Sequence, residues 1–378
     1  MIQKEVQMDS EVQAKTRPLF SVVVSCYNSR ETIGRVLSSL TKQGLDPEEL
    51  EVIISDDCST EPYDDIVDSY RNFLQIKRVN TDYNCCPGNT RQRGLENATG
   101  VWVTFSDHDD EYVEGALGKL RDMLDNELKT EQFYIVTSFY KQNDFIETKT
   151  TEEMLADHSG GWTHGKFYNL DNFIKRFDLH FKKDLMSNED IYFTTSVNCI
   201  LDYLHAKHLD AGIFVNELFT YIWYSHPRSL SHTLYDDGKV TFFERTFLDY
   251  AESTGDRYLQ SFKDGILPWD KARYCIIDTI LLYYFYTIYF LYDNPNNYLK
   301  ENFDYVKGFL KDVKETFHMT NKEIWTQCTE FNCTRFKEAR DYAEIATGIY
   351  IPSMTFTQWL HEFSPDEDDE KLYLYYKK

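Results

Sequence analysis

Residues 20–40 read FSVVVSCYNSRETIGRVLSSL and contain two different periodicities. Residues 20–25 form a short run of apolar, mostly β-branched side chains, which is typical of a buried strand. Asn28 and Glu31 follow with the three-residue spacing of a capping box, a common start of a helix. Apolar side chains within 33–40 then recur on one helical face. The stretch therefore predicts a strand that passes directly into a helix.

The same alternation continues along the first part of the chain, with helical stripes between strand-like runs. The further strand-like runs are EVIIS at 51–55, residues 76–79, VWVTF at 101–105 and FYIVTSFY at 133–140. Alternating strands and helices, with mostly apolar strands, are typical of a parallel sheet covered by helices on both sides. The predicted fold class is therefore α/β, with right-handed crossovers.

The pattern then changes, first to short mixed elements and later to helical periodicity rich in Tyr and Phe. We expect a leader at 1–17, an α/β domain at 18–235 and a mainly helical region at 236–378. Residues 275–292, CIIDTILLYYFYTIYFLY, are nearly long enough to span a bilayer. Because they contain Asp278 and many tyrosines, we interpret them as a buried or interfacial helix.

The composition argues against several classes of partner. The 378 residues include 40 basic and 63 acidic side chains, for a formal net charge of −23. This balance disfavours a nucleic-acid-binding protein, which needs a basic face, and it disfavours a polybasic membrane anchor. The eight cysteines include no CxxC pair, so no zinc or redox motif is indicated. Reduced thiols and a polar N-terminus without a signal sequence predict a cytoplasmic protein.

Three predicted strands end in unusual groups of polar residues. The groups are Ser25-Cys26-Tyr27-Asn28, Asp56-Asp57-Cys58-Ser59 and Ser106-Asp107-His108-Asp109-Asp110-Glu111. Ligands of open parallel α/β sheets bind outside the carboxyl ends of the strands, so the three groups should meet at one edge. This convergence is the main functional signal. The first turn lacks a GxGxxG pattern, which argues against a nicotinamide cofactor.

The third group has four carboxylates in five residues, which repel one another unless a cation or a helix N-terminus compensates. Oxygen ligands of this kind suit Mg²⁺ or Mn²⁺, which often bridge to a substrate phosphate. Asp107 and Asp109 are the candidate metal or nucleotide ligands. The alternative for Asp110 and Glu111 is that they cap the helix that follows.

Five blocks, in order between residues 18 and 233, resemble the signature motifs of family 2-like glycosyltransferases. They are PLFSVVVSCYNSRETI (18–33), EVIISDDCST (51–60), PGNTRQRGLENATGVWVTFSDHDD (87–110), THGKFYNLDNFIKRFDLHFKKDLMSNEDIYF (163–193) and YIWYSHPRSLSHT (221–233). The resemblance implies the GT-A fold and transfer of a sugar from a nucleotide donor. Departures from the motifs include Gln92 for an Asn, Cys58 for a Gly and His108 within the DxD motif.

The resemblance also implies roles for individual residues. Nucleotide-binding positions are matched by Ser25, Tyr27, Asp57, Arg91 and Asp107. Among these, Asp57 matches the carboxylate that binds the base, usually uracil. The DxD motif of the family, which binds ribose and Mn²⁺ or Mg²⁺, falls on Asp107 and Asp109. Arg91 has an alternative interpretation as a simple surface ion pair.

The remaining candidates concern the acceptor and the chemistry. Asp190 matches the general base of an inverting reaction, with Glu189 as second choice and helix capping as the alternative for both. Lys166 and Tyr168 match positions beside the donor or acceptor sugar, and Trp162 is a candidate for sugar stacking or for core packing.

The leading hypothesis is a metal-dependent, inverting glycosyltransferase that uses a UDP-sugar and a glycan or glycolipid acceptor. A non-catalytic partner subunit and a metal-dependent phosphohydrolase are the alternatives. His226 and His232 are candidates for a further metal ligand or ordinary loop histidines. Residues 236–378 could form an acceptor platform, a contact between two copies of the chain, or a contact with the inner face of a membrane.

Overall fold

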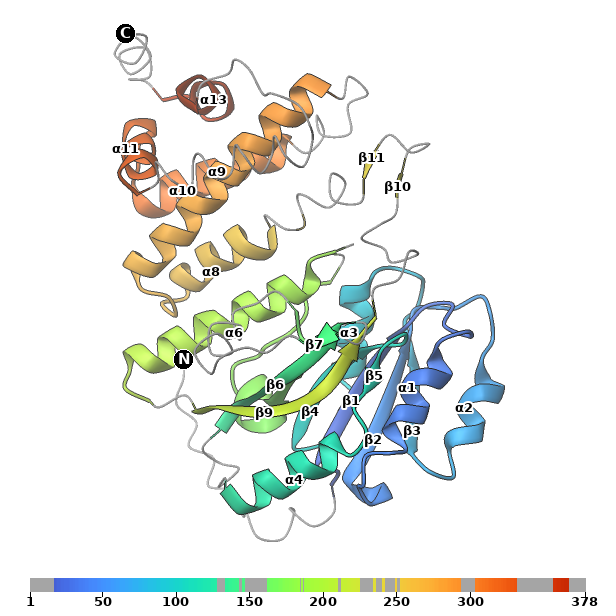
Figure 1. Ribbon diagram of the computed structural model, residues 1–378. Helices are drawn as coiled ribbons and strands as arrows, with labels where there is room; N and C mark the ends of the chain where they lie inside the picture. The colour runs from blue at the N-terminus through green and yellow to red at the C-terminus, as the bar shows by residue number, and fades with distance from the viewer. Residues whose placement is uncertain are drawn as a thin grey trace. The chain divides into compact units, whose positions relative to one another are not determined.

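The computed structural model describes residues 17–127, 133–142, 145–146, 162–183, 185, 187–209, 212–224, 234–235, 240–241, 249, 252–293, 303–331 and 356–366. Contacts between residues divide the chain into two compact units (Figure 1). One unit comprises Met1–Asn198 and Leu204–Thr233, and the other comprises Cys199–Tyr203 and Leu234–Lys378.

The first unit is built on one mixed sheet, whose order is β3-β2-β1-β4-β8-β6-β9-β5, with β7 paired to β6. Its strands are β1 (Phe20–Cys26), β2 (Leu50–Asp56), β3 (Gln75–Asn80), β4 (Trp102–Asp107), β5 (Glu111–Tyr112), β6 (Phe133–Gln142), β7 (Phe145–Ile146), β8 (Lys166–Asn169) and β9 (Gly212–Trp223). The block β3-β2-β1-β4 is parallel, as is the β6–β9 pair, whereas β8 and β5 pair antiparallel with their neighbours. The predicted α/β class with a mostly parallel sheet is confirmed.

Helices cover both faces of this sheet, and the central strands β1 and β2 are therefore buried on both sides. The helices of the first unit are α1 (Ile33–Leu40), α2 (Asp64–Tyr70), α3 (Pro87–Leu95), α4 (Ala116–Glu127) and α6 (Glu189–Ala206), which also supplies Cys199–Tyr203 to the other unit. Side chains of α1, α2 and α4 share one core with Val22 and Val24. Alternate residues of β1 point to opposite faces, so Val23, which approaches Gly94 of α3, belongs to the other face.

The close approach of α3 to β1 requires a glycine. A methyl carbon at Gly94 would lie 2.3 Å from Cγ1 of Val23 and 3.3 Å from Cβ of Ser55. Real Cβ atoms do not approach other carbons this closely, so any larger residue would push α3 away from the sheet. This packing fixes the position of Arg91, which projects from the same helix.

The predicted capping box at Asn28 and Glu31 is wrong. Helix α1 begins at Ile33, and Asn28 has a left-handed backbone with φ of 48°. The Asn28 side-chain oxygen accepts hydrogen bonds from the backbone N–H groups of Thr60 and Glu61 instead, at 2.9 and 3.3 Å. Tertiary contacts with the loop after β2 therefore replace the local cap.

The second unit is mainly helical, as predicted. Its elements are β10 (Leu234–Tyr235), β11 (Val240–Thr241), the π-helical turn η4 (Glu252–Asp256), α8 (Arg257–Lys263), α9 (Trp269–Asp293), α10 (Phe303–Phe317), α11 (Asn321–Phe331) and α13 (Phe356–Phe363). Ile280, Leu310 and Trp359 are fully buried in its core. Residues 275–292 lie in α9, and none of the helices in the described ranges is long and apolar enough to cross a bilayer.

Candidate active site

The ends of three parallel strands bring the predicted polar groups together. Register pairs Ser25 of β1 with Asp107 of β4 on one side and with Ser55 of β2 on the other. The Ser25 hydroxyl donates a hydrogen bond to Oδ1 of Asp107 at 3.0 Å. Asp57 follows directly after β2, and its backbone N–H donates to the carbonyl of Cys26 at 2.8 Å. The predicted meeting of these strand ends at one edge is therefore observed.

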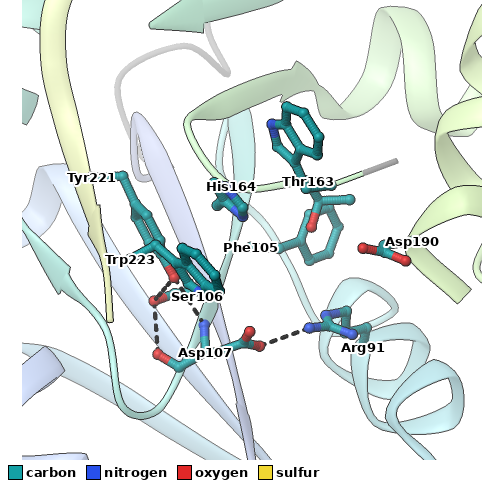
Figure 2. A pocket seen from close by; sticks show the side chains of 10 residues that line it. Arg91, Phe105, Ser106, Asp107, Thr163, His164, Asp190, Tyr221 and Trp223 are labelled. Carbon is teal, nitrogen blue, oxygen red and sulfur yellow. Dashed lines mark hydrogen bonds and ion pairs between the residues drawn. The ribbon is translucent and has the colours of Figure 1, made fainter. Parts of the chain in front are cut away.

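A cavity of about 380 Å³ opens beside this edge (Figure 2). Its lining residues come from α3, β4, the segment before β8, the start of α6 and the end of β9. They are Arg91, Phe105, Ser106, Asp107, Trp162, Thr163, His164, Asp190, Tyr221 and Trp223. Four residues proposed from the sequence line this cavity: Arg91, Asp107, Trp162 and Asp190. The proposed base-binding residue Asp57 does not line it.

Arg91 is the central cation of the cavity. Its guanidinium donates to Oδ1 of Asp107 at 2.7 Å and also forms an ion pair with Glu189. Figure 2 shows this guanidinium between the carboxylates of Asp107 and Asp190. Arg91 therefore pairs with the carboxylates of the site, and the alternative of a surface ion pair is wrong.

The two cavity carboxylates have pKa values shifted in opposite directions. Desolvation would raise the pKa of Asp107, but the nearby Arg91 guanidinium, His108 and the Ser25 hydrogen bond together lower it. Desolvation raises the pKa of Asp190, and the charge of Asp107 acts in the same direction against the opposing effect of Arg91. Asp107 is thus the better permanent anion, and Asp190 is the stronger base of the two.

The residues Asp107–Glu111 at the end of β4 form an acidic turn, and Asp110 holds this turn against β9. Its carboxylate accepts hydrogen bonds from the Tyr221 hydroxyl at 2.7 Å and from the Tyr224 backbone N–H at 2.9 Å. It is 1% exposed, and desolvation together with the charge of Asp107 raises its pKa to about 8. The alternative of helix capping is wrong for Asp110, and Glu111 lies in the short strand β5.

Contacts from α1 hold the other side of the same turn. Oγ1 of Thr32 lies 2.6 Å from Nδ1 of His108, and Arg35 donates to the backbone carbonyl of Asp109 at 2.7 Å. Arg35 also stacks on the ring of Tyr224, 4.7 Å from its centroid. Thr32 and Arg35 were not candidates in the sequence because their motif contained no signal for contact with residues so far along the chain.

Three stacked aromatic rings form one wall of the cavity. Trp162, His164 and Tyr221 stack with centroid separations of 6.0 and 5.3 Å and with angles of 15° and 13° between ring planes. The Tyr221 hydroxyl also accepts a hydrogen bond from the backbone N–H of Asp107 at 3.1 Å. His164 and Tyr221 are thus cavity residues that were not proposed as site residues from the sequence.

The other sugar-site candidates lie outside the cavity lining. Lys166 is 2% exposed, and its ammonium donates to the carbonyl of Trp162 at 2.9 Å. Tyr168 is 0% exposed and packs against Phe105 and Phe193. Lys166 therefore supports the segment that carries Trp162, and Tyr168 supports Phe105, which lines the cavity.

The predicted base-binding residues occupy the next part of the same sheet edge. Asp57 is 7% exposed, and its carboxylate lies close to Thr81 and Cys85. Tyr27 is 46% exposed at the end of β1. The loops after β1 and β2 are joined by the hydrogen bond from the Asn28 N–H to the Ser59 hydroxyl at 2.8 Å.

The acidic turn offers few protein ligands for a metal. In the described ranges, no group of three or more His, Cys, Asp or Glu side chains lies close enough to hold an ion. His226 and His232 are outside these ranges. Mg²⁺ commonly needs only one or two protein carboxylates, with waters and substrate phosphates completing its shell. Asp107 and Asp109 provide a donor set of that kind.

Comparison with known proteins agrees with this geometry. Residues 21–198 match the sequence profile described as Glycosyl transferase family 2. This part of the chain belongs to glycosyl transferase family 2. The family 2 segment contains β1 to β4, α3 and the start of α6, which carry every cavity carboxylate.

Two curated relatives of the family 2 segment are glycosyltransferases. One is poly(ribitol-phosphate) β-N-acetylglucosaminyltransferase TarS of Staphylococcus aureus (strain MW2), to which the chain is 32% identical over 197 residues. The aligned region covers 50% of this chain and 33% of that protein. The other is GalNAc(5)-diNAcBac-PP-undecaprenol β-1,3-glucosyltransferase of Campylobacter jejuni, to which the chain is 34% identical over 105 residues. That alignment covers 27% of this chain and 33% of that protein. The chain thus spans about a third of the length of these relatives.

The fold likeness extends further than the family 2 match. The crystal structure of S. aureus TarS 1-349 in complex with UDP-GlcNAc aligns with a TM-score of 0.59 and 19% identity, over 88% of this chain and 93% of that one. This likeness, together with the strand order described above, confirms the predicted GT-A architecture.

Proposed function

We propose that this chain is an inverting glycosyltransferase that moves a hexosyl or N-acetylhexosaminyl group from UDP to a hydroxyl group of a glycan or glycolipid acceptor. The observation that carries the proposal is that Arg91, Asp107 and Asp190 line one cavity at the strand edge where Asp57 also lies. A cation, an anion and a proton acceptor in one cavity are the groups that this transfer requires.

The UDP part of the proposal rests on Asp57 and on the relatives. An ionised carboxylate can only accept hydrogen bonds, so it favours a base that presents a ring N–H, as uracil does, over one that presents a bare ring nitrogen, as cytosine does. TarS of S. aureus has been crystallised with UDP-GlcNAc and with UDP. Ser25 and Tyr27, at the end of the adjacent strand, would complete the nucleoside site.

Divalent metal is the proposed cofactor. Asp109 and Asp107 would hold Mn²⁺ or Mg²⁺ together with the donor's diphosphate, and the ion would supply charge neutralisation for the departing UDP. Arg91 contributes fixed positive charge to the same region, because its guanidinium already lies 2.7 Å from Oδ1 of Asp107. Asp107 is well suited to both contacts because its lowered pKa keeps it ionised.

Asp190 is the proposed general base. Its carboxylate takes the proton of the acceptor hydroxyl while the acceptor oxygen forms a bond to the anomeric carbon. The bond from that carbon to the diphosphate breaks, and its electron pair leaves with UDP. Attack from the face opposite the diphosphate inverts the anomeric centre. Glu189 is the poorer candidate because the residue is 5% exposed and its carboxylate is already paired with Arg91.

For the acceptor, we propose a chemical class. The named substrates of the relatives are polymers or lipid-linked saccharides, which favours a cell-surface polysaccharide or its precursor as the acceptor. Trp162 of the aromatic wall, together with Trp223 of the cavity lining, offers flat apolar surface of the kind that packs against sugar rings.

A nucleotide-sugar screen tests the proposal. The full chain is incubated with UDP-, GDP- and TDP-sugars in the presence of Mn²⁺ or Mg²⁺, and release of nucleoside diphosphate is measured with and without glycan acceptors. We expect UDP release from at least one UDP-sugar. Release of inorganic phosphate would favour a phosphohydrolase. Binding of UDP with no transfer or hydrolysis of any donor would favour a non-catalytic subunit.

A further inference from the structure

The carboxylate of Asp57 is held by side chains that no motif of the sequence singled out. Thr81 follows directly after β3, and its hydroxyl oxygen lies 2.8 Å from Oδ1 of Asp57. Cys85 lies between β3 and α3, and its backbone N–H is 3.1 Å from Oδ1 and 3.3 Å from Oδ2. The Cys85 thiol sulfur lies 3.2 Å from the same Oδ1.

Among these groups, Cys85 provides the larger share of the donors. The single proton of the Thr81 hydroxyl is shared among several acceptors, because the carbonyl of Tyr83 is 2.9 Å away and the carbonyl of Asp56 is 3.4 Å away. Cys85 directs both its N–H and its S–H at Asp57. Oδ1 receives the Thr81 hydroxyl, the Cys85 thiol and the shorter contact of the Cys85 N–H, whereas Oδ2 receives only the longer contact of that N–H, at 3.3 Å, and keeps acceptor capacity for a ligand.

The protonation state of the thiol is consistent with this role. Desolvation and the neighbouring charge of Asp57 raise the pKa of Cys85. A raised pKa keeps the sulfur protonated at neutral pH, so it donates a hydrogen bond rather than placing a thiolate against a carboxylate. A second thiol, that of Cys58, donates to the carbonyl of Thr81 at 3.0 Å and holds that residue in place.

We infer that Cys85 is a positioning and specificity-determining residue of the nucleotide site, whose thiol and backbone N–H orient Asp57 toward the base. The inference rests on the proposed use of a uridine nucleotide. Misorientation of Asp57 should weaken recognition of the base while leaving the contacts of Arg91 and Asp107 with the diphosphate intact. The expected signature is a loss of discrimination between bases, which general destabilisation would not produce.

The test compares UDP and CDP binding by calorimetry for the wild-type chain, Cys85→Ala, Cys85→Ser and Cys275→Ser. For Cys85→Ala we expect about tenfold weaker UDP binding, unchanged CDP binding and, with the donor sugar, a raised KM at an unchanged kcat. A serine hydroxyl can replace the S–H donor, so Cys85→Ser should recover most of the UDP affinity. Cys275, which is half-buried in the second unit, serves as the matched control and should bind UDP like the wild type.

Thiol labelling provides a measurement that needs no variant. The Cys85 thiol loses its proton to solvent, and its sulfur adds to the carbon–carbon double bond of N-ethylmaleimide. A carbon–sulfur bond forms, the π bond of the reagent breaks, and the adjacent ring carbon takes up a proton. UDP should slow labelling of Cys85, which is half-buried, and should leave the labelling rate of Cys275 unchanged. Peptide mass spectrometry resolves the two sites.

The outcomes separate this inference from the proposed function. Wild-type binding of UDP, with equal affinity and equal base discrimination in Cys85→Ala and no protection of Cys85 from labelling, overturns the inference alone. A wild-type chain that binds no uridine nucleotide overturns the proposed donor and the inference together. If Cys85→Ala does not fold, UDP protection of the wild-type thiol decides the question.

Discussion

At the scale of single residues, the site depends on a division of labour between two carboxylates. Asp107 and Asp190 line the same cavity and face the same cation, Arg91. Contacts with Arg91, His108 and Ser25 lower the pKa of Asp107, whereas desolvation raises that of Asp190. One carboxylate is therefore suited to holding charge and the other to accepting a proton.

Replacing Asp190 with Asn should abolish turnover and keep donor binding. The amide preserves the shape of the side chain but cannot accept the acceptor's proton, so we expect kcat to fall by about 10²- to 10⁴-fold. UDP should still raise the melting temperature. Asp68→Asn, on the exposed surface of α2, is the matched control and should retain full activity. Normal turnover by Asp190→Asn would remove this residue from the base role.

The pH dependence of turnover should report the raised pKa of Asp190. The base acts only when ionised, so activity should fall as the pH decreases through its pKa. Because desolvation raises that pKa, the fall should begin at higher pH than for an ordinary aspartate of about 3.9. The measurement is kcat/KM against pH. A profile that stays flat down to the ordinary aspartate range would exclude this assignment.

At the scale of elements, two contacts between distant segments create the site. Helix α3 packs so closely on β1 that a methyl carbon at Gly94 would meet Val23. The acidic turn after β4 is held to β9 by Asp110 and to α1 by Arg35. Displacement of either element would therefore change the position of Arg91 or Asp107 in the cavity.

Gly94→Ala should destabilise the protein and weaken UDP binding together. Overpacking against Val23 should lower the free energy of unfolding by about 1–3 kcal/mol. Gly34→Ala on α1 is the matched control: its added carbon would lie 3.6 Å from Ile66, an ordinary contact, so we expect no loss of stability. Urea unfolding measures both, and Gly94→Ala combined with Val23→Ala should recover part of the loss.

Asp110 should make the stability of the fold depend on pH. Its pKa is about 8 in the folded chain and about 3.9 when unfolded, so between these values the folded state binds the extra proton. This contribution to stability is full below the unfolded pKa and is lost as the pH rises toward 8. Asp110→Asn lacks the titration, so urea unfolding should favour it over the wild type progressively with rising pH. A difference independent of pH would contradict the assignment.

At the scale of the whole molecule, the family match and the fold likeness cover different shares of the chain. The family 2 profile matches residues 21–198, whereas the likeness to TarS 1-349 covers 88% of the chain. The helical second unit has its own buried core around α9, α10 and α13. Its proposed roles in binding acceptor, a second copy or a membrane surface stay predictions, as do the boundaries at 17/18 and 235/236.

Donor and metal should stabilise the whole chain together. A ligand that binds only the folded state stabilises it by about 2.7 kcal/mol at a hundred times its Kd. We therefore expect UDP with Mn²⁺ to raise the melting temperature more than either alone, and EDTA to remove the metal's share. The Asp109→Ala variant should lose that share and keep the response to UDP alone. Identical shifts with and without metal would argue for a metal-independent enzyme.

The elements of the sheet edge could be predicted from the amino-acid sequence alone. Apolar runs such as 20–25 and 101–105 predicted the central strands, because their side chains are buried on both faces of a parallel sheet. The polar residues after each run predicted which side chains meet, because parallel strands end at one edge. Periodicity and position along the chain were sufficient for these inferences.

How those side chains are held depends on tertiary contacts. Asn28 bonds the loop after β2 instead of capping α1, Lys166 and Tyr168 are buried outside the cavity lining, and the Cys85 thiol contacts the carboxylate of Asp57. Each of these outcomes depends on contacts between residues that are distant in the sequence. Such contacts are fixed by how helices and strands pack, and a local pattern contains no information about that packing.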